Sequence, residues 1–315
     1  TGVATLNTGD EIINLLIKKN WPEIYEKNYI MTFPTHTPTF YWWQNRLMKR
    51  NQIYANADLK FLCGTNILYT NMLRPEPAWN LFLGNTKIAK GTVCVGTGIG
   101  INSKKTTRYT KSLFNRVLSH EYIHSVRDEK TKKYLEEMGF KAWNTGCPTL
   151  WGLTPDFCSK IPTTKSDSVV FTLTSYEPDR ENDQLMIDIL KNNYKKLYFW
   201  PQSLGDAEYI KSFSGYDCIE IIAPNLKAYD EILKTNIDYV GNRLHGGIFA
   251  IQHQCRAIII SIDYRAKEMS KTYSFSCIQR EKIQEELEKK INSNWSTEIK
   301  GLDFEQIAKW KRQFI

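Results

Sequence analysis

The chain has 315 residues, enough for two domains of ordinary size. Hydrophobic residues make up 42% and charged residues 24%, a balance typical of a soluble globular protein. The formal net charge of +8 favours an anionic substrate or an anionic membrane surface. Nucleic acid is not expected as a partner, because Lys and Arg are scattered and no zinc-finger, basic-zipper or RNA-binding motif occurs.

In the first half of the chain, short apolar runs alternate with helical patterns. Strands are expected at residues 2–5, 28–33, 59–63, 92–96 and 122–127, and helices at residues 10–19, 42–54, 109–119 and 129–138. Such alternation predicts a parallel sheet with helices on both faces.

Residues 147–166 are rich in Pro, Thr, Ser and Gly, which predicts a connection between two domains. Strands then follow at 168–173, 196–200 and 218–222, helices at 183–192, 206–213 and 226–234, and a strand–turn–helix–strand unit at 239–262. The expected organisation is an N-terminal lobe at 1–155, a C-terminal lobe at 156–280, and charged C-terminal helices at 281–315 that cross back to the first lobe. The predicted fold is therefore α/β, with two Rossmann-like lobes and a ligand cleft at the carboxyl ends of their strands.

Seven cysteines are spread singly, without a C-x-x-C pair. This odd, dispersed set predicts buried, reduced thiols in a cytoplasmic protein, not a disulfide framework. No apolar run reaches the roughly 18 residues that a membrane-spanning helix needs.

The strongest motif is Asn242-Arg243-Leu244-His245-Gly246-Gly247, at a turn from a strand into a helix. A helix start offers free backbone N–H groups and the positive end of the helix dipole. Arg243 and His245 add a guanidinium and an imidazole at the same place. Together these groups predict a receptor for a phosphate or a carboxylate. Lys267, just past the next strand, is a further candidate contact for that anion.

Two other strand ends carry polar candidates, each with a structural alternative. In Asn7-Thr8-Gly9-Asp10, Gly9 allows a close backbone approach, and Asp10 either caps the helix or meets an acceptor hydroxyl. In Arg127-Asp128, Arg127 is either a second cation of the ligand site or the partner of a helix-capping Asp128.

Two tempting motifs fail on context. His120-Glu121-Tyr122-Ile123-His124 has the H-E-x-x-H spacing of a zinc helix, but it straddles a helix end and a strand start, so a helix-to-strand corner is expected. Gly96-Thr97-Gly98-Ile99-Gly100 lacks the spacing and the immediate helix of a dinucleotide fingerprint, and is expected to be a loop that lines the ligand cleft.

In seven pieces that keep their order, the chain resembles the polysaccharide pyruvyl transferase family. They are N-T-G-D-E at 7–11, C-G-T-N at 63–66, V-G-T-G-I-G at 95–100, S-V-R-D-E-K-T-K-K-Y-L-E-E-M-G at 125–139, W-P-Q-S-L-G-D at 200–206, N-R-L-H-G-G-I-F-A at 242–250 and I-D-Y-R-A-K at 262–267. The chain departs from the family at Cys147-Pro148, where Asp-Pro is frequent, and at Gly64-Thr65, where a longer Gly run is usual.

The resemblance implies a fold like the two-lobed GT-B glycosyltransferases, with the acceptor on the first lobe and the donor on the second. It implies transfer of a pyruvyl unit from phosphoenolpyruvate to two hydroxyls of a sugar, forming a cyclic ketal in cell-surface or extracellular polysaccharide. No cofactor or metal is expected besides this co-substrate. The expected catalytic residues are His245 as general acid and Asp10 as base; the expected donor contacts are Arg243, Leu244, Gly246, Lys267 and Arg127; the expected acceptor contacts are Asn7, Gly9 and Gln202.

The acceptor is expected to be a saccharide, carried on a lipid or a nucleotide. The C-terminal segment 309–315 mixes cations with bulky apolar residues, so it predicts either peripheral contact with the inner face of the membrane or a helix packed on the first lobe. Two other functions remain open: a GT-B-type glycosyltransferase that uses a nucleotide sugar, and a non-catalytic protein that binds a sugar or an anion.

Overall fold

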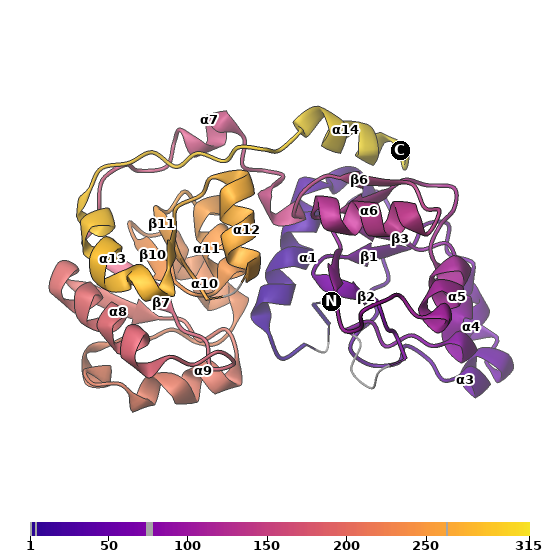
Figure 1. The fold of residues 1–315 in the computed structure, drawn as a ribbon, viewed down its shortest axis with the longest axis horizontal. Helices are drawn as coiled ribbons and strands as arrows, with labels where there is room; N and C mark the ends of the chain where they lie inside the picture. The colour runs from indigo at the N-terminus through magenta and orange to yellow at the C-terminus, as the bar shows by residue number, and fades with distance from the viewer. Residues whose placement is uncertain (1, 4, 74–77, 263) are drawn as a thin grey trace. The chain divides into compact units, whose positions relative to one another are not determined.

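The structure is a computed structural model that describes residues 2–3, 5–73, 78–262 and 264–315 (Figure 1). The chain divides into two compact units. The first contains Ile13–Trp151, Asp303–Ile315 and the residues before Leu6, and the second contains Leu6–Ile12 and Gly152–Leu302. Compared with the expected ranges, Leu6–Ile12 therefore groups with the second unit, and the end of the tail with the first.

The first unit is built from short strands between helices. Its helices are α2 (Pro22–Tyr25), α3 (Trp42–Leu47), α4 (Arg50–Ala55), the 3-10 helix η1 (Leu83–Ala89), α5 (Arg108–Val117), α6 (Glu129–Glu137), the 3-10 helix η2 (Pro148–Leu150) and α14 (Phe304–Arg312). Its strands are β1 (Phe61–Cys63), β2 (Asn66–Tyr69), β3 (Val93–Val95), β4 (Gly98–Gly100), β5 (His124–Val126) and β6 (Ala142–Asn144). They pair in parallel as β1–β3, β2–β4 and β5–β6. Helix α1 (Thr8–Asn20) begins among the residues of the second unit and ends among those of the first.

Three predicted elements of this region are corrected. Residues 28–33 form no strand, because Phe33 packs edge-on against Phe40 and Tyr54 instead of joining a ladder. Residues 2, 3 and 5 form no strand either, and residues 1 and 4 lie outside the described residues. The predicted helix at 42–54 breaks into α3 and α4, because Met48 is extended, with φ −94° and ψ 111°.

The H-E-x-x-H segment is the expected helix-to-strand corner. His124 starts β5 and is fully buried. Its Nδ1 accepts a hydrogen bond from the Cys94 N–H at 3.1 Å, so Nε2 carries the proton and donates to the Ser119 carbonyl at 2.9 Å. Burial lowers the pKa of His124 to about 4. Both ring nitrogens therefore serve the main chain as a neutral imidazole.

The C-terminal tail uses its apolar residues in the core of the first unit. Trp310 of α14 is fully buried, with its ring centroid 5.0 Å from that of Trp21, and its Nε1 donates to the Ile123 carbonyl. Phe314 packs on Phe61 and Tyr122 at 5.2 and 5.0 Å. The apolar face of the tail is thus already occupied by protein.

The second unit contains a six-stranded parallel sheet in the order β12-β11-β10-β7-β8-β9. The strands are β7 (Ser168–Thr172), β8 (Lys196–Phe199), β9 (Glu220–Ile221), β10 (Asp238–Gly241), β11 (Ala257–Ser261) and β12 (Cys277–Gln279). The helices are α7 (Pro155–Cys158), α8 (Arg180–Asn193), α9 (Leu204–Tyr209), α10 (Leu226–Leu233), α11 (Leu244–Gln252), α12 (Tyr264–Tyr273) and α13 (Ile283–Asn292), with 3-10 turns η3 (Ile210–Ser212), η4 (Tyr216–Cys218) and η5 (Arg280–Lys282). The predicted helix at 206–213 is therefore α9 plus η3, and the strand predicted at 218–222 is only the short edge strand β9.

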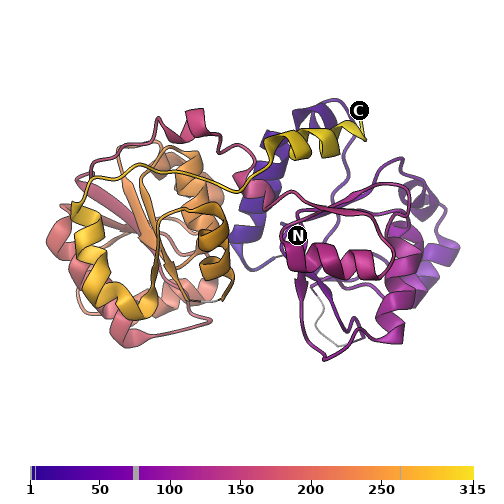
Figure 2. The same ribbon diagram turned by 45° about the horizontal axis from the view of Figure 1, so that its top comes forward.

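Helices cover both faces of this sheet (Figure 2). Val169 and Phe171 of β7 share one core with α8 and α13, as alternate residues of a strand must. On the other face, Trp200 stacks on Tyr229 of α10 at 3.8 Å, and Tyr229 packs on Phe249 of α11. Because all six strands run parallel, their carboxyl ends meet at one edge of the sheet, where polar loops gather.

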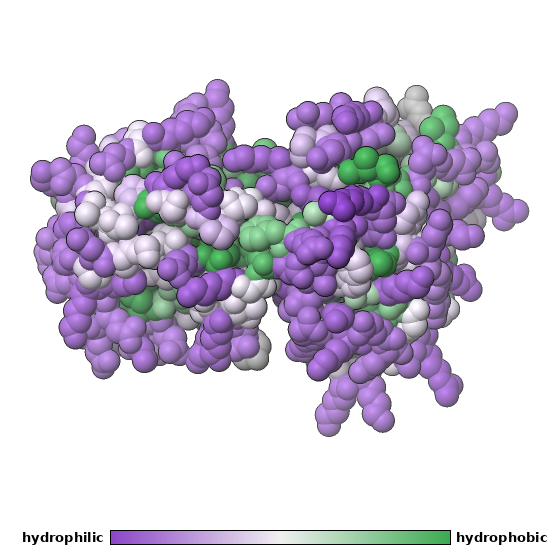
Figure 3. All heavy atoms as spheres, turned by 90° about the horizontal axis from the view of Figure 1, so that it is seen from above, coloured by the Kyte–Doolittle hydropathy of each residue, from purple (hydrophilic) through white to green (hydrophobic). Residues whose placement is uncertain are grey.

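Hydrophilic side chains dominate the face of each unit seen in Figure 3. All seven cysteines are free thiols. Among the described residues, no helix combines the length and the apolar character needed to cross a bilayer.

Candidate functional site

The candidate site lies at the carboxyl edge of the second unit's sheet, where β10 turns into α11. The turn is short, because only Asn242 and Arg243 separate the two elements. A side-chain Cβ at Gly247 would fall 2.7 Å from Ile259 and 2.8 Å from Tyr239, so a glycine is needed for the helix to pack this closely on the sheet. The Tyr239 hydroxyl donates to the Arg243 carbonyl at 2.9 Å. The first turn of α11 is thus held rigidly at the sheet edge.

Arg243 is buried beside a carboxylate that the sequence analysis did not assign to it. Its guanidinium forms an ion pair with Asp206, through Nη2 and both carboxylate oxygens. The side chains are only 5% and 0% exposed. Nε donates to the Leu173 carbonyl at 3.3 Å, and the guanidinium lies 5.0 Å from the centroid of the Tyr176 ring. Arg243 therefore has a compensated charge and a fixed orientation.

Asp206 joins three loops at this edge. Besides Arg243, its carboxylate accepts hydrogen bonds from the Ser175 N–H at 2.9 Å, the Ser203 N–H at 3.0 Å and the Gln202 N–H at 3.2 Å. These donors come from the loop after β7 and from the loop after β8, while Arg243 follows β10. A single buried carboxylate thereby fixes the loops around the start of α11. In the sequence, Asp206 ends the W-P-Q-S-L-G-D piece and completes the capping pattern S-x-x-D at 203–206.

The three predicted acceptor contacts lie in one hydrogen-bonded group. Gln202 Nε2 donates to Asn7 Oδ1 at 2.7 Å, and Asn7 Oδ1 also accepts from the Gly9 N–H at 3.0 Å. The Gln202 carbonyl accepts from the Thr8 N–H at 3.1 Å. A Cβ at Gly9 would lie 2.6 Å from Gln202 Nε2, so any larger residue here would displace the Gln202 amide. The structure thus brings the start of α1 onto the loop after β8.

The same glutamine reaches the start of α11. A Cβ at Gly246 would lie 3.3 Å from Gln202 Oε1. The Gln202 amide therefore separates the first turns of α1 and α11, two helix starts with their positive dipole ends. Its Oε1 atom is buried and has no hydrogen-bond partner among the residues that the structure describes. A buried acceptor of this kind is costly unless a donor reaches it.

The two predicted catalytic residues sit on these helix starts. His245 lies in the first turn of α11 and is 9% exposed. Asp10 lies in the first turn of α1 and is equally buried. Their catalytic roles stay predictions, but both are anchored in the second unit near Gln202.

A second buried carboxylate lies beneath the site. Asp183 of α8 accepts from the Tyr209 hydroxyl at 2.9 Å and lies 3.8 Å from Arg280 Nη2. Burial raises the pKa of Asp183 to about 6, although Arg280 opposes the shift. Arg280 Nη1 donates to the Glu177 carbonyl, in the loop after β7. This pair could not be predicted from the sequence, because its partners come from distant segments of the chain.

Lys267 and Arg127 have hydrogen-bond partners outside the group of residues around Arg243 and Gln202. Lys267 lies on α12, and its Nζ donates to Gln279 Oε1 at 2.9 Å, beside β12. Arg127 belongs to the first unit, where its Nη2 donates to Asn66 Oδ1 at 2.6 Å. Asp128 caps α6 and lies 3.6 Å from Arg127 Nε, which is the structural alternative stated for this pair. Their role as phosphate contacts stays a prediction.

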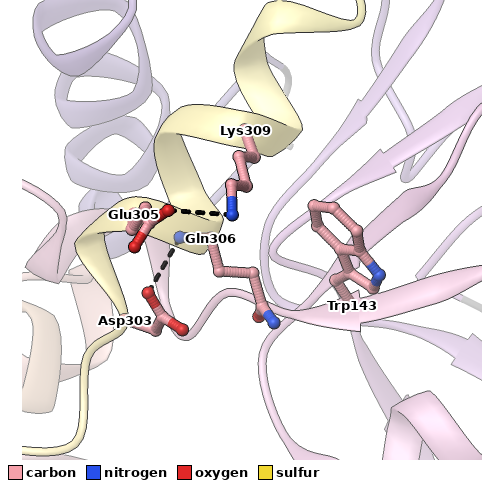
Figure 4. A pocket seen from close by; sticks show the side chains of 5 residues that line it. All are labelled: Trp143, Asp303, Glu305, Gln306 and Lys309. Carbon is pink, nitrogen blue, oxygen red and sulfur yellow. Dashed lines mark hydrogen bonds and ion pairs between the residues drawn. The ribbon is translucent and has the colours of Figure 1, made fainter.

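A cavity of about 190 Å³ lies elsewhere, beside α14 in the first unit (Figure 4). It is lined by Trp143, Asp303, Glu305, Gln306 and Lys309. Lys309 is paired with Glu305 at 2.8 Å, and Asp303 caps α14 through the Gln306 N–H. Its charged groups thus serve the helix, so this hollow is not the candidate site.

Comparisons with known proteins agree with the fold. A model of the polysaccharide pyruvyl transferase family matches residues 7–264. No curated protein shows a significant match. The Staphylococcus aureus MnaA–UDP structure has a TM-score of 0.52 and 10% identity, over 98% of this chain and 95% of that one. The Methanocaldococcus jannaschii UDP-GlcNAc 2-epimerase, in complex with UDP-GlcNAc and UDP, has a TM-score of 0.43 and 17% identity, over 72% and 71% of the two chains. MnaA has the two-lobed GT-B-like fold, so the predicted fold class is confirmed.

Proposed function

The chain belongs to the polysaccharide pyruvyl transferase family, and from that premise we propose that it transfers the pyruvyl unit of phosphoenolpyruvate to two hydroxyls of a sugar. The product is a cyclic ketal on a cell-surface or extracellular polysaccharide. The observation that carries this proposal is the start of α11, where His245 follows a guanidinium that Asp206 holds in place. A donor with both a phosphate and a carboxylate suits a helix start combined with a guanidinium and an imidazole.

The donor end is assigned to Arg243, Leu244, His245 and Gly246. Among the described residues, the hydrogen bonds of the Arg243 guanidinium run from Nε and Nη2, so we assign its Nη1 to the donor carboxylate. The N–H groups of Leu244 and Gly246 lie in the first turn of α11, where an anion is favoured. The Asp206 carboxylate lowers the net charge of the site, but it fixes the orientation of the guanidinium, so that Nη1 keeps one direction.

The chemistry follows from the donor. His245, as imidazolium, gives its proton to C3 of phosphoenolpyruvate, so that the methylene becomes a methyl group and positive charge develops at C2. One sugar hydroxyl attacks C2, the C2–O bond to phosphate breaks, and the second hydroxyl closes the ring. Asp10 is assigned to accept the proton of the attacking hydroxyl and to pass it to the departing phosphate, and the proton of the second hydroxyl restores the His245 imidazolium.

The acceptor end is assigned to Asn7, Gly9 and Gln202. The unpartnered Gln202 Oε1 can accept a hydrogen bond from a sugar hydroxyl. Because Gln202 Nε2 is bound to Asn7, the amide has a fixed orientation and presents this oxygen consistently. We further propose a saccharide on a lipid or nucleotide carrier, in the cytoplasm, and a reaction that needs no metal and no cofactor. Chelation that abolishes turnover would overturn the metal-free part of this proposal.

The test compares His245, in the first turn of α11, with His253, which directly follows the last residue of this helix. His245→Ala should lower phosphate release from phosphoenolpyruvate by about 10²–10⁴-fold, the usual contribution of a general acid. His253, at the other end of α11, bonds to the Phe249 carbonyl and to Asp230, so His253→Ala is the matched control and should retain turnover. Equal activities of the two variants would rule out the assigned role of His245.

A nucleotide-sugar glycosyltransferase is the second candidate, because the similar MnaA structure contains UDP within the same two-lobed fold. A ligand that binds only the folded protein raises its melting temperature. Phosphoenolpyruvate should therefore stabilise the chain, and UDP and GDP should not. Stabilisation by a nucleoside diphosphate alone would favour the glycosyltransferase.

A further inference from the structure

A group of large apolar side chains on the first unit is exposed and is used neither by the core nor by the candidate site. We call it the aromatic surface, and it consists of Tyr41, Trp42, Trp43, Leu47, Met48 and Ile53, on α3, α4 and the residues beside them. Trp42, Leu47 and Ile53 are 60%, 74% and 66% exposed. Contiguous exposed apolar side chains of this size mark interaction sites in folded proteins.

A separate cluster of aromatic rings packs the same segment of the chain on the inside. Phe40 stacks on Tyr54 at 5.7 Å, and Phe33 meets both rings edge-on at 6.0 and 5.3 Å. Asn51 Nδ2 donates to Asn45 Oδ1 at 3.3 Å, which ties α4 to α3. Helices α3 and α4 are thus already packed through this inner cluster, and the residues of the aromatic surface are not part of it.

Positive charge surrounds the aromatic surface. Arg46 and Lys49 are exposed within it, and Lys87 and Lys90 lie on or beside η1, which packs against α3 and α4. Residues 28–120 contain twelve Lys and Arg but only two acidic residues, Asp58 and Glu76. Those 93 residues therefore carry a formal charge of +10, while the whole chain carries +8. The basic character of the protein is concentrated in the region that bears the aromatic surface.

We propose that the aromatic surface docks the first unit onto an anionic lipid bilayer. Trp and Tyr favour the level of the lipid headgroups, and neighbouring Arg and Lys are attracted to anionic lipids. A second copy of this chain fits less well, because a symmetric contact would bring the same cations face to face without acidic partners. The proposal does not depend on the proposed activity, and it uses a surface other than α14, whose Ile307 and Trp310 are buried.

The experiment is flotation of the full chain with vesicles of phosphatidylcholine, with and without phosphatidylglycerol. The chain should bind the anionic vesicles at low salt, and 0.5 M NaCl, on the order of the salt that screens charges beyond a few ångströms, should release most of it. Arg46→Gln/Lys49→Gln should weaken binding by about 30-fold, from the usual contribution of two cations at an anionic surface. Trp42→Ser/Trp43→Ser should weaken binding by about tenfold or more and reduce quenching of tryptophan fluorescence by brominated lipid.

Matched control variants show whether binding depends on the aromatic surface or on any exposed cations and apolar side chains. Lys130→Gln/Lys133→Gln removes two exposed cations at the same spacing on α6, and Leu73→Ser/Ile101→Ser removes two exposed apolar side chains. Both controls should bind like the unchanged protein, and circular dichroism should show every variant folded. The proposal fails if the unchanged chain does not float with anionic vesicles, or if the Trp42/Trp43 variant binds as well as the controls. A dimer that this variant dissociates, without vesicle binding, would assign the surface to a second copy.

Discussion

Replacing Asp206 with Asn should destabilise the second unit far more than the loss of an ordinary ion pair. The carboxylate is fully buried, compensates Arg243, and accepts from the N–H groups of Ser175, Gln202 and Ser203. Asparagine keeps the volume but leaves the buried guanidinium without a counter-charge. Breaking a buried pair in this way costs about 3–5 kcal/mol.

Hydrogen exchange is the suitable assay, because peptides from β7, β8 and β10 report the second unit alone. Asp167→Asn is the control: Asp167 pairs with Lys195 at 2.8 Å, but both side chains are exposed, so its loss should cost under about 1 kcal/mol. Arg243→Met combined with Asp206→Asn should cost about 2 kcal/mol less than the sum of the single variants, since no unpaired guanidinium remains. Equal effects of Asp206→Asn and Asp167→Asn would refute the reasoning.

Three further variants test other parts of the account. His245→Ala should lose turnover while its melting temperature stays within a few degrees of the unchanged protein, and a large drop in melting temperature would indicate a structural role instead. The pKa of Asp183 is raised to about 6, so the folded protein favours the protonated carboxyl group. The contribution of this group to folding stability is therefore lost as pH rises from about 4 to 6. Urea unfolding across this pH range should show the unchanged protein losing up to about 3 kcal/mol of folding free energy relative to Asp183→Asn. In Gly98→Ala, the new Cβ would lie 2.6 Å from both Arg127 Nη2 and Asn66 Oδ1, so thermal unfolding should show a loss of about 1–3 kcal/mol, and an unchanged melting temperature would mean that Arg127 can move.

The second unit could be predicted largely from its sequence. Residues 168–173 form a nearly continuous apolar run, as a strand buried on both faces does, and the structure has β7 there. The first unit gave a weaker signal, because most of its strands have three residues and the apolar run at 28–33 serves an aromatic cluster instead. Periodicity cannot tell such a run from a short strand.

The sequence predicts which polar residues follow the strands of the sheet, but it does not predict which of them form pairs across different strand ends. Arg243, His245 and Gln202 were found because polar groups at the carboxyl ends of parallel strands converge. The pairing of Arg243 with Asp206 was missed, because 37 residues separate them and their distance depends on how β7 lies between β8 and β10. Asp183 and Arg280 were missed for the same reason.

Formation of a pyruvate ketal from phosphoenolpyruvate can be measured directly. The chain is incubated with phosphoenolpyruvate and a panel of saccharide acceptors in D₂O, and the products are analysed by mass spectrometry. We expect one added pyruvyl ketal, deuterium in its methyl group, an equal amount of released phosphate, and loss of all three in His245→Ala but not in His253→Ala. Transfer of a sugar from a nucleotide sugar to the same acceptors, with phosphoenolpyruvate left intact, would contradict this expectation.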